Sequence, residues 1–231
     1  MKIRIKIQGA LIFLAIAAIF FLRKYLVPRW KSGFAEESMD ISGMIVFLFG
    51  FLIRITARGY KEDNTFSGHA LVKGGLYGIT RNPMYFGTFM IGAGAILVLS
   101  NLLAFFIFVI IFLFIYWPQI KIEENILSAR FGREYEEYCE KTPRLFPSAR
   151  NLLPAGRYIS LKPFWIKKEL SSFAASFIAI AAIEIWEDTV IFGRSAFFTE
   201  LAEFTLIAVI AALFIAHKAG KTNGLFIRTR K

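Results

Sequence analysis

Apolar residues along the chain fall into six blocks, which are separated by polar segments rich in lysine and arginine. The blocks cover residues 9–27, 41–55, 85–99, 102–117, 172–186 and 197–216. A helix that spans a membrane needs about 20 largely apolar residues, so several blocks must extend into the residues beside them. The pattern predicts an all-α, polytopic integral membrane protein with about six transmembrane helices.

The first block follows the basic start MKIRIK, a combination that also occurs in secretory signal peptides. Arg23 and Lys24 stand where the small residues of a cleavage site should follow, so we expect a membrane helix here. The composition agrees with a membrane protein, because 56% of the 231 residues are hydrophobic.

The basic residues are distributed unevenly between the two sides of the predicted membrane. The chain has 28 lysines and arginines and a formal net charge of +11. If the N-terminus is cytoplasmic, five of them lie outside: Arg23, Lys24, Arg29, Lys31 and Arg194. This asymmetry follows the positive-inside rule and predicts that both termini are cytoplasmic. Nucleic-acid binding is disfavoured, because the basic residues are spread over loops between membrane helices.

The polar chemistry is concentrated in two long connections on the predicted cytoplasmic side. We therefore divide the chain into N-terminal membrane helices (residues 1–60), a core that contains the first connection, the helical hairpin and the cytoplasmic helix (residues 61–150), and a linker with two further membrane helices (residues 151–231). The single cysteine, Cys139, excludes an internal disulfide framework. The sequence predicts no metal site.

The first connection contains a glycine-rich segment that runs into the motif ITRNPMYFG at residues 79–87. Gly74, Gly75 and Gly78 surround Tyr77, and glycines at this density permit close approach of the backbone to a ligand. A flexible link before a helix would have the same composition. In the helix that follows, we interpret Gly87 and its neighbouring glycines as positions of close helix packing.

The second connection begins with two adjacent carboxylates, Glu123 and Glu124, just beyond the fourth block. We expect the fourth membrane helix to continue through them and to be interrupted or ended by Gly132. Adjacent residues on a helix point about 100° apart, so both carboxylates cannot face one ligand equally. An anion, a cation and aromatic residues near one membrane face suit an amino-acid-like ligand, although residue types alone do not identify it.

Two stretches joined by an apolar hairpin, GHALVKGGLYGITRNPMYFG and EENILSARFGREYEEYCEKTPRLFP, resemble the isoprenylcysteine carboxyl methyltransferase family. Its members are integral membrane enzymes that use S-adenosylmethionine. The resemblance covers residues 69–147. It implies that Glu123 holds the cofactor, plausibly its α-ammonium group, and that Arg81 braces the loop or neutralises the cofactor's carboxylate. The cofactor-binding residues that it implies are His69, Ala70, Leu71, Val72, Tyr77, Arg81, Asn82, Pro83, Met84, Tyr85, Glu123 and Glu124.

Two positions depart from the family pattern. Asn82 replaces a histidine, and Gln119 stands where family members active on prenylcysteine have an arginine that meets the substrate carboxylate. Gln119 remains a candidate substrate contact in the catalytic site, but it supplies no charge. The stretch NPMYFG also resembles phosphatidylethanolamine N-methyltransferases. We therefore predict a methyltransferase that acts on a lipophilic substrate from the bilayer by carboxyl O-methylation. Amine N-methylation is one alternative. A sterol-reductase-like enzyme that binds a nicotinamide cofactor and transfers no methyl group is another.

Overall fold

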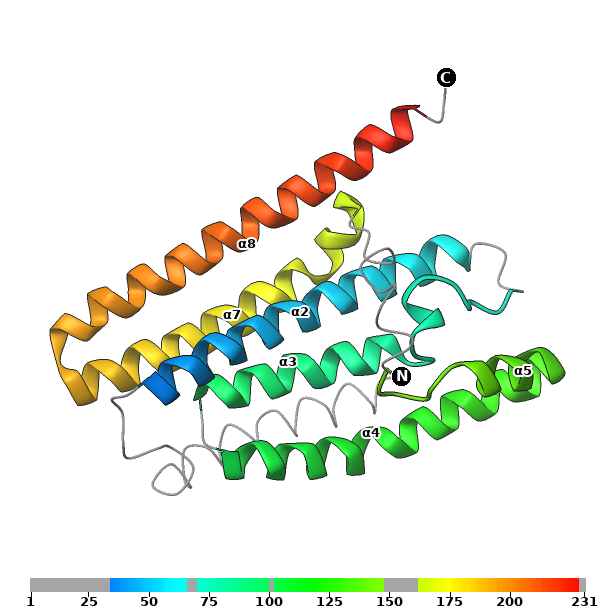
Figure 1. Ribbon diagram of the computed structural model, residues 1–231, viewed down its shortest axis with the longest axis horizontal. Coiled ribbons are helices and arrows are strands. Elements are labelled where there is room, and N and C mark those ends of the chain that lie inside the picture. Colours follow the sequence, from blue (N-terminus) through cyan, green and yellow to red (C-terminus); the bar gives the residue numbers. More distant parts are fainter. Residues whose placement is uncertain (1–33, 66–69, 100–101, 148–161, 229–231) are drawn as a thin grey trace.

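The structure is a computed structural model that describes residues 34–65, 70–99, 102–147 and 162–228, with regular secondary structure that is entirely helical (Figure 1). The first apolar block and His69 lie outside the described residues. The helices are α2 (Phe34–Asn64), η1 (Gly75–Gly78, a 3-10 helix), α3 (Pro83–Leu99), α4 (Leu102–Phe131), α5 (Arg133–Lys141), α7 (Pro163–Phe192) and α8 (Arg194–Arg228). Within these residues the predicted all-α class is confirmed.

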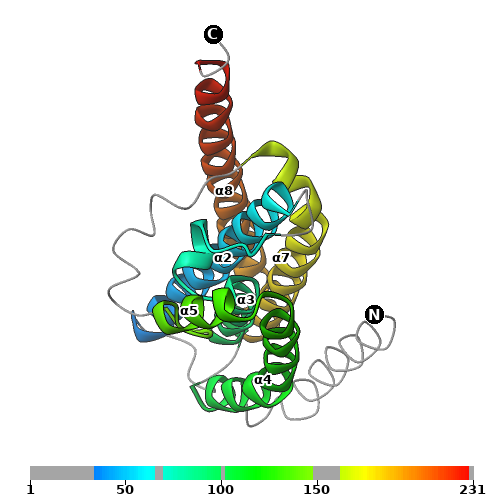
Figure 2. The ribbon, with the colours of Figure 1, turned by 90° about the vertical axis from the view of Figure 1, so that its right-hand side faces the viewer.

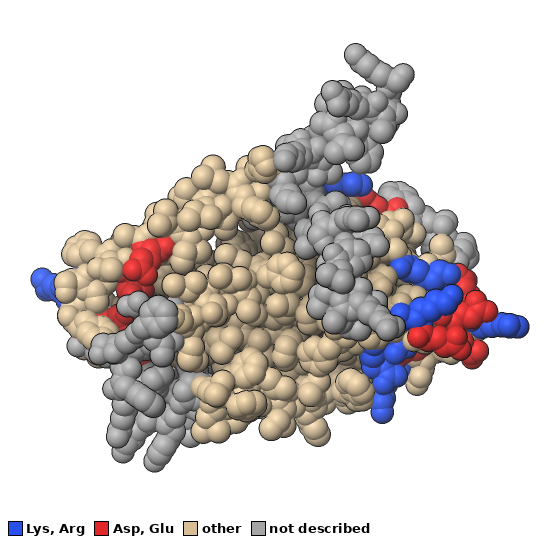
Figure 3. All heavy atoms as spheres, viewed as in Figure 1, with Lys and Arg blue, Asp and Glu red and all other residues tan. Residues whose placement is uncertain are grey.

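Four of the described helices are long and apolar enough to cross a membrane: α2, α4, α7 and α8. The third predicted span, α3, has 17 residues and lies at the short limit. Figure 3 shows a broad band without charged side chains across the middle of the visible face, with charged groups towards both ends. This distribution is typical of a membrane protein, whereas the predicted cytoplasmic position of both termini stays a prediction.

Helix α2 lies in the middle of the bundle, packed along α3 on one side and against α7 on another. Helix α4 packs against α3 and helix α8 against α7, so α4 and α8 lie on opposite sides of the bundle (Figures 1 and 2). Aromatic residues from α2 and α7 fill the centre, where Phe47 and Phe51 contact Phe173. Large apolar side chains elsewhere on these helices are exposed, as expected for surfaces that face lipid.

Glycines on α2 and α3 face one another and let the two backbones approach closely. A Cβ atom at Gly94 would lie 2.4 Å from the backbone nitrogen of Phe47, and one at Gly87 would lie 2.9 Å from the carbonyl oxygen of Gly50. Only residues without a Cβ fit such a seam. Gly87 and Gly94 therefore pack helices together, as the sequence indicated.

The helix boundaries bear on two predictions. Helix α4 runs without interruption from Leu102 through both glutamates, and it ends at Gly132, which has a φ of +52°. The predicted continuation of the fourth membrane helix is confirmed. The apolar blocks at residues 172–186 and 197–216 predicted two separate helices, and the structure separates α7 from α8 by Gly193 alone, because α7 continues to Phe192 and α8 begins at Arg194.

Candidate functional site

A cavity of about 600 Å³ lies where α2 ends and α3 begins, and part of its wall comes from α4 and α5. Residues from both predicted cytoplasmic connections contribute to its wall. The residues that border it are Arg54, Lys61, Thr65, Ala70, Leu71, Val72, Tyr77, Arg81, Asn82, Pro83, Met84, Tyr85, Thr88, Tyr116, Glu123, Leu127, Arg130, Phe131, Tyr135 and Tyr138. The wall therefore combines a carboxylate, basic groups, phenol rings and apolar side chains.

Most of the predicted cofactor-binding residues border this one cavity, although their contact with a cofactor stays a prediction. They are Ala70, Leu71, Val72, Tyr77, Arg81, Asn82, Pro83, Met84, Tyr85 and Glu123. His69 lies outside the described residues. Gln119 and Glu124 are not part of the cavity wall. Their predicted contacts with substrate and cofactor stay predictions, and the structure shows which residues they contact.

Glu123 is the acidic residue of the cavity wall, and its position is fixed by neighbours on α3 and α4. The hydroxyl of Tyr85 donates a hydrogen bond of 2.6 Å to Glu123 Oε1, and the amide of Gln119 donates to the same oxygen at 3.2 Å. Tyr85 also packs edge-to-face on Tyr116, with 5.6 Å between the ring centroids. Gln119 thus orients the carboxylate of Glu123 from one helical turn away.

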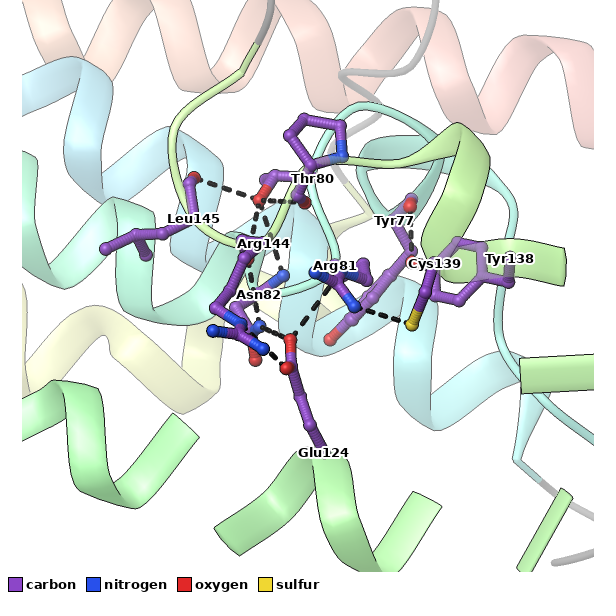
Figure 4. Close-up of polar contacts among 10 residues, drawn as sticks. Tyr77, Thr80, Arg81, Asn82, Glu124, Tyr138, Cys139, Arg144 and Leu145 are labelled. Carbon is purple, nitrogen blue, oxygen red and sulfur yellow. Dashed lines mark hydrogen bonds and ion pairs between the residues drawn. The ribbon is translucent and has the colours of Figure 1, made fainter. Parts of the chain in front are cut away.

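Glu124 is not among the residues that border the cavity, and its carboxylate lies in a polar cluster that Figure 4 shows. Its carboxylate accepts hydrogen bonds from Arg144 Nε at 2.8 Å and from Asn82 Nδ2 at 3.1 Å. Arg81 Nε lies 3.6 Å away, and another nitrogen of this guanidinium donates to Cys139 Sγ. With 7% of its side chain exposed, Glu124 is enclosed by these partners. We therefore interpret Glu124 as a brace of the loop that carries Arg81, and its predicted cofactor contact stays a prediction.

The glycine-rich loop is held against the segment that follows α5 (Figure 4). The hydroxyl of Thr80 lies 2.9 Å from the carbonyl oxygen of Leu145, and the backbone N–H of Arg81 donates to the carbonyl of Pro143 at 2.9 Å. The hydroxyl of Tyr138 donates to the carbonyl of Tyr77 at 2.6 Å. These contacts fix one wall of the cavity, and sequence reasoning identified neither Thr80 nor Pro143.

The buried tyrosines of this wall stay protonated at neutral pH. Burial raises the pKa of Tyr77 and of Tyr138 well above the ordinary phenol value, and the nearby Glu123 raises that of Tyr77 further. Tyr138 therefore remains a hydrogen-bond donor to the loop.

Arg54 is a cavity residue that the sequence interpretation treated only as a topological charge. It lies on α2 inside the second apolar block, and its guanidinium donates to Thr88 Oγ1 at 3.0 Å. It also forms an ion pair of 3.1 Å with Glu169 of α7. An arginine within an apolar block is itself a signal, because ionisable residues inside membrane helices are costly and commonly functional.

Comparison with known proteins supports the resemblance seen in the motifs. The phospholipid methyltransferase family matches residues 39–134. Protein-S-isoprenylcysteine O-methyltransferase B of Arabidopsis thaliana is 33% identical over 144 residues, which are 57% of this chain and 67% of that protein. Protein-S-isoprenylcysteine O-methyltransferase of Saccharomyces cerevisiae is 39% identical over 75 residues, covering 32% of this chain and 31% of that protein. No solved structure matches the chain.

Coverage differs between these relatives. The match spans about a third of the yeast proteins and two thirds of the Arabidopsis protein. The region that matches the phospholipid methyltransferase family, residues 39–134, includes the residues of η1, α3 and α4 that border the cavity. Together with the long apolar helices, the relatives identify an integral membrane protein. The chain therefore belongs to the isoprenylcysteine carboxyl methyltransferase family.

Proposed function

We propose that the protein is a methyltransferase that uses S-adenosylmethionine to methylate a small lipid or lipidated acceptor, in the manner of an isoprenylcysteine carboxyl O-methyltransferase. The observation that carries this proposal is the position of Glu123. Its carboxylate, oriented by Tyr85 and Gln119, borders the same cavity as the glycine-rich loop and the NPMY segment. The motif residues are thus gathered around one anion at the end of the membrane helices.

The residues of the cavity fit S-adenosylmethionine. The volume of about 600 Å³ lies within the usual range for small-molecule sites. Glu123 would pair with the α-ammonium group through a charge-assisted hydrogen bond. The rings of Tyr77, Tyr85 and Tyr116 offer aromatic faces, which attract ligand cations such as a sulfonium.

When bound, S-adenosylmethionine supplies a methyl group on a positively charged sulfur. A carboxylate oxygen of the acceptor forms the new C–O bond with a lone pair, while the electrons of the broken C–S bond remain on sulfur. A carboxylate with a reference pKa near 3.5 is already ionised, so the step needs no general base. The task of this chain is therefore to hold and align the two reactants, which is worth roughly 7–11 kcal/mol in favourable cases.

Amine N-methylation is the second candidate, because the phospholipid methyltransferase family matches residues 39–134. An amine acceptor must lose a proton before or during transfer, so it requires a base or a water path. The sterol-reductase-like alternative is set aside, because the matched family and the relatives are both named as methyltransferases.

Substitution of Glu123 tests the proposal. We expect Glu123→Gln to weaken binding of S-adenosylmethionine roughly 10- to 100-fold, because the charge-assisted hydrogen bond is lost. The measurement is isothermal titration calorimetry on purified protein in detergent, with melting temperature as a check on folding.

Glu140→Gln is the matched control, because this exposed glutamate on α5 lies outside the cavity wall. It should bind S-adenosylmethionine like the wild type. Unchanged affinity in Glu123→Gln, or wild-type protein that binds no S-adenosylmethionine, would contradict the proposal.

A further inference from the structure

Arg54 is a charged residue at the end of the second apolar block, within a helix that is long and apolar enough to cross a membrane. It lies within the candidate span Ser38–Asn64 and borders the cavity with 26% of its side chain exposed. Its neighbour Thr88 lies more than one helical turn into α3 from Pro83. An ionisable residue at such a place is costly, and when it faces a cavity it commonly marks a substrate path.

Among the described residues, the ion pairs around Arg54 leave one positive charge uncompensated. Glu169, with 1% of its side chain exposed, pairs with Arg54 at 3.1 Å and with Arg58 at 2.7 Å. Glu62 lies 3.8 Å from Arg58 and also pairs with Lys168. Three cations therefore share two carboxylates in this cluster. Of its five members, Arg54 is the one that borders the cavity.

The motif on α3 makes room for Arg54. A Cβ atom at Gly87, the last residue of NPMYFG, would lie 2.8 Å from Arg54 Cγ and 3.2 Å from its backbone nitrogen. Such distances require a displacement of the arginine stem or of α2. The glycine that ends the motif therefore determines where the guanidinium of Arg54 lies.

The guanidinium of Arg54 retains hydrogen-bonding capacity. It has five N–H donors, of which one bonds Thr88 and one nitrogen faces Glu169. Its Nε has no hydrogen-bond partner among the described residues. A guanidinium recognises a carboxylate through charge-assisted and often paired hydrogen bonds, which give orientation as well as affinity.

We propose that Arg54 binds the carboxylate of the methyl acceptor, and that Glu169 of α7 positions Arg54 for this contact. The inference rests on the proposed methyltransferase function and names the acceptor class of that site. The missing arginine at Gln119 cast doubt on a carboxylate acceptor, but that doubt assumed a cation supplied by α4. The structure supplies the cation from α2 and holds it with a residue outside the segment that resembles the family.

The overall charge of the cavity wall favours the same acceptor class. Four basic residues border the cavity, Arg54, Lys61, Arg81 and Arg130, against the single acidic residue Glu123. Glu123 is the residue proposed to hold the cofactor's ammonium group. A protonated amine acceptor would meet a predominantly positive wall, whereas a carboxylate would be attracted to it.

The experiment compares wild type, Arg54→Gln and Arg54→Lys as purified full chains in lipid nanodiscs. The acceptor is an N-acylated S-prenylcysteine with a free carboxylate, and its carboxamide analogue serves as a competitor. We expect Arg54→Gln to raise KM for the acceptor roughly 10- to 100-fold and to abolish the preference for the carboxylate over the carboxamide. Arg54→Lys should show a smaller rise in KM and keep part of the preference for the carboxylate, because lysine keeps the charge but lacks the paired N–H donors of the planar guanidinium. Affinity for S-adenosylmethionine should stay near that of the wild type.

Two further variants separate positioning from general stability. Glu169→Gln should raise KM and reduce the preference for the carboxylate, while Glu169→Asp should partly restore it. Arg58→Gln removes another partner of Glu169 that does not border the cavity. We expect it to change KM far less than Arg54→Gln does. A loss of stability alone would lower the yield of folded enzyme without changing the ratio between the two ligands.

Labelled methyl transfer into a membrane lipid extract covers acceptors other than the probe. A base-labile methyl ester that is lost in Arg54→Gln supports the inference. A base-stable N-methyl product in the wild type overturns it, as does an unchanged KM and carboxylate preference in Arg54→Gln. Either result leaves the methyltransferase proposal standing. If wild-type protein binds no S-adenosylmethionine, the proposed function fails and the inference fails with it.

Discussion

Two buried glutamates, Glu124 and Glu169, each lie between two arginines, but the two clusters differ in what surrounds them. Glu124 connects Arg81, in the loop between η1 and α3, with Arg144 beyond α5. Asn82 supplies a further hydrogen bond to its carboxylate. The guanidinium of Arg81 borders the cavity, but it is 13% exposed and is engaged by both Glu124 and Cys139. Arg81 and Glu124 are thus enclosed, whereas Arg144 is 34% exposed, and the cluster joins two segments of the chain.

The cluster around Glu169 joins α7 to α2 and is more open. Arg54 and Arg58 are both more exposed than Arg81, and Arg54 faces the cavity. Similar groups of side chains therefore serve different ends according to their surroundings. An enclosed pair fixes the backbone, because separating it would leave a buried charge without a partner. In the proposed function, the pair of Arg54 with Glu169 holds a charge in place for a ligand.

Glu124→Gln should give the largest loss of stability among the variants that sharpen this comparison. It leaves Arg81 and Arg144 without a counter-charge, which we expect to cost about 2 kcal/mol because Arg144 is partly exposed. Glu169→Gln should cost less, since both of its arginines are more accessible to solvent than Arg81. The measurement is the melting temperature in detergent, followed by tryptophan fluorescence.

The same two variants should rank in the opposite order in acceptor selectivity. Glu169→Gln should change the preference for the carboxylate, whereas Glu124→Gln should not. Glu124→Gln should also weaken S-adenosylmethionine binding less than Glu123→Gln does. If Glu124→Gln has the larger effect on cofactor affinity, the assignment of the two glutamates is reversed.

The sequence was sufficient to predict features that depend on local order. The apolar blocks located α2, α3, α4, α7 and α8, and the adjacent glutamates were correctly expected to lie on a continuous helix. Their angular separation on that helix also indicated that only one of them would face a ligand. Glu123 borders the cavity and Glu124 does not.

The role of Arg54 could not be predicted in the same way, because it depends on residues distant in sequence. Its ion-pair partner Glu169 is 115 positions away and lies outside the motif region. Charge counting assigned Arg54 to the cytoplasmic side as a topological signal. The predicted boundary at residue 60, between the N-terminal membrane helices and the core, also stays a prediction. Helix α2 lies before this boundary for most of its length, but it packs along α3 and contributes Arg54 to the cavity.

Gly87→Ala should have a smaller, mixed effect that tests the arrangement around Arg54. The added Cβ would lie 2.8 Å from Arg54 Cγ and 2.9 Å from the carbonyl oxygen of Gly50, so α2 and α3 must separate slightly. Overpacking of this kind costs about 1–3 kcal/mol. We expect a raised KM for the acceptor together with a lower melting temperature, both measured on detergent-purified protein.

Gly92→Ala provides the control on the same helix. Its Cβ would meet the ring of Phe108 on α4 at 2.4 Å, whereas the Cβ added at Gly87 would meet Arg54. It should lower the melting temperature without a comparable change in KM. Equal effects of the two substitutions on KM would argue against a specific role of Gly87 in placing Arg54.

The smallest effect is expected for Tyr138, in the cavity wall formed by η1 and α5, and it concerns the pH dependence of stability. Burial raises the pKa of Tyr138 above its ordinary value of about 10, so the folded protein keeps this proton at a pH where the unfolded chain has lost it. The stabilisation is fully present below about pH 10 and is lost as the pH rises through the raised pKa. Tyr138→Phe should cost about 1 kcal/mol at pH 8, because the hydrogen bond to the carbonyl of Tyr77 is missing. Between about pH 9 and 11, however, its melting temperature should fall less steeply than that of the wild type. Parallel curves for the two proteins would mean that Tyr138 ionises freely in the folded state, and the wall formed by η1 and α5 would then be open to solvent rather than enclosed.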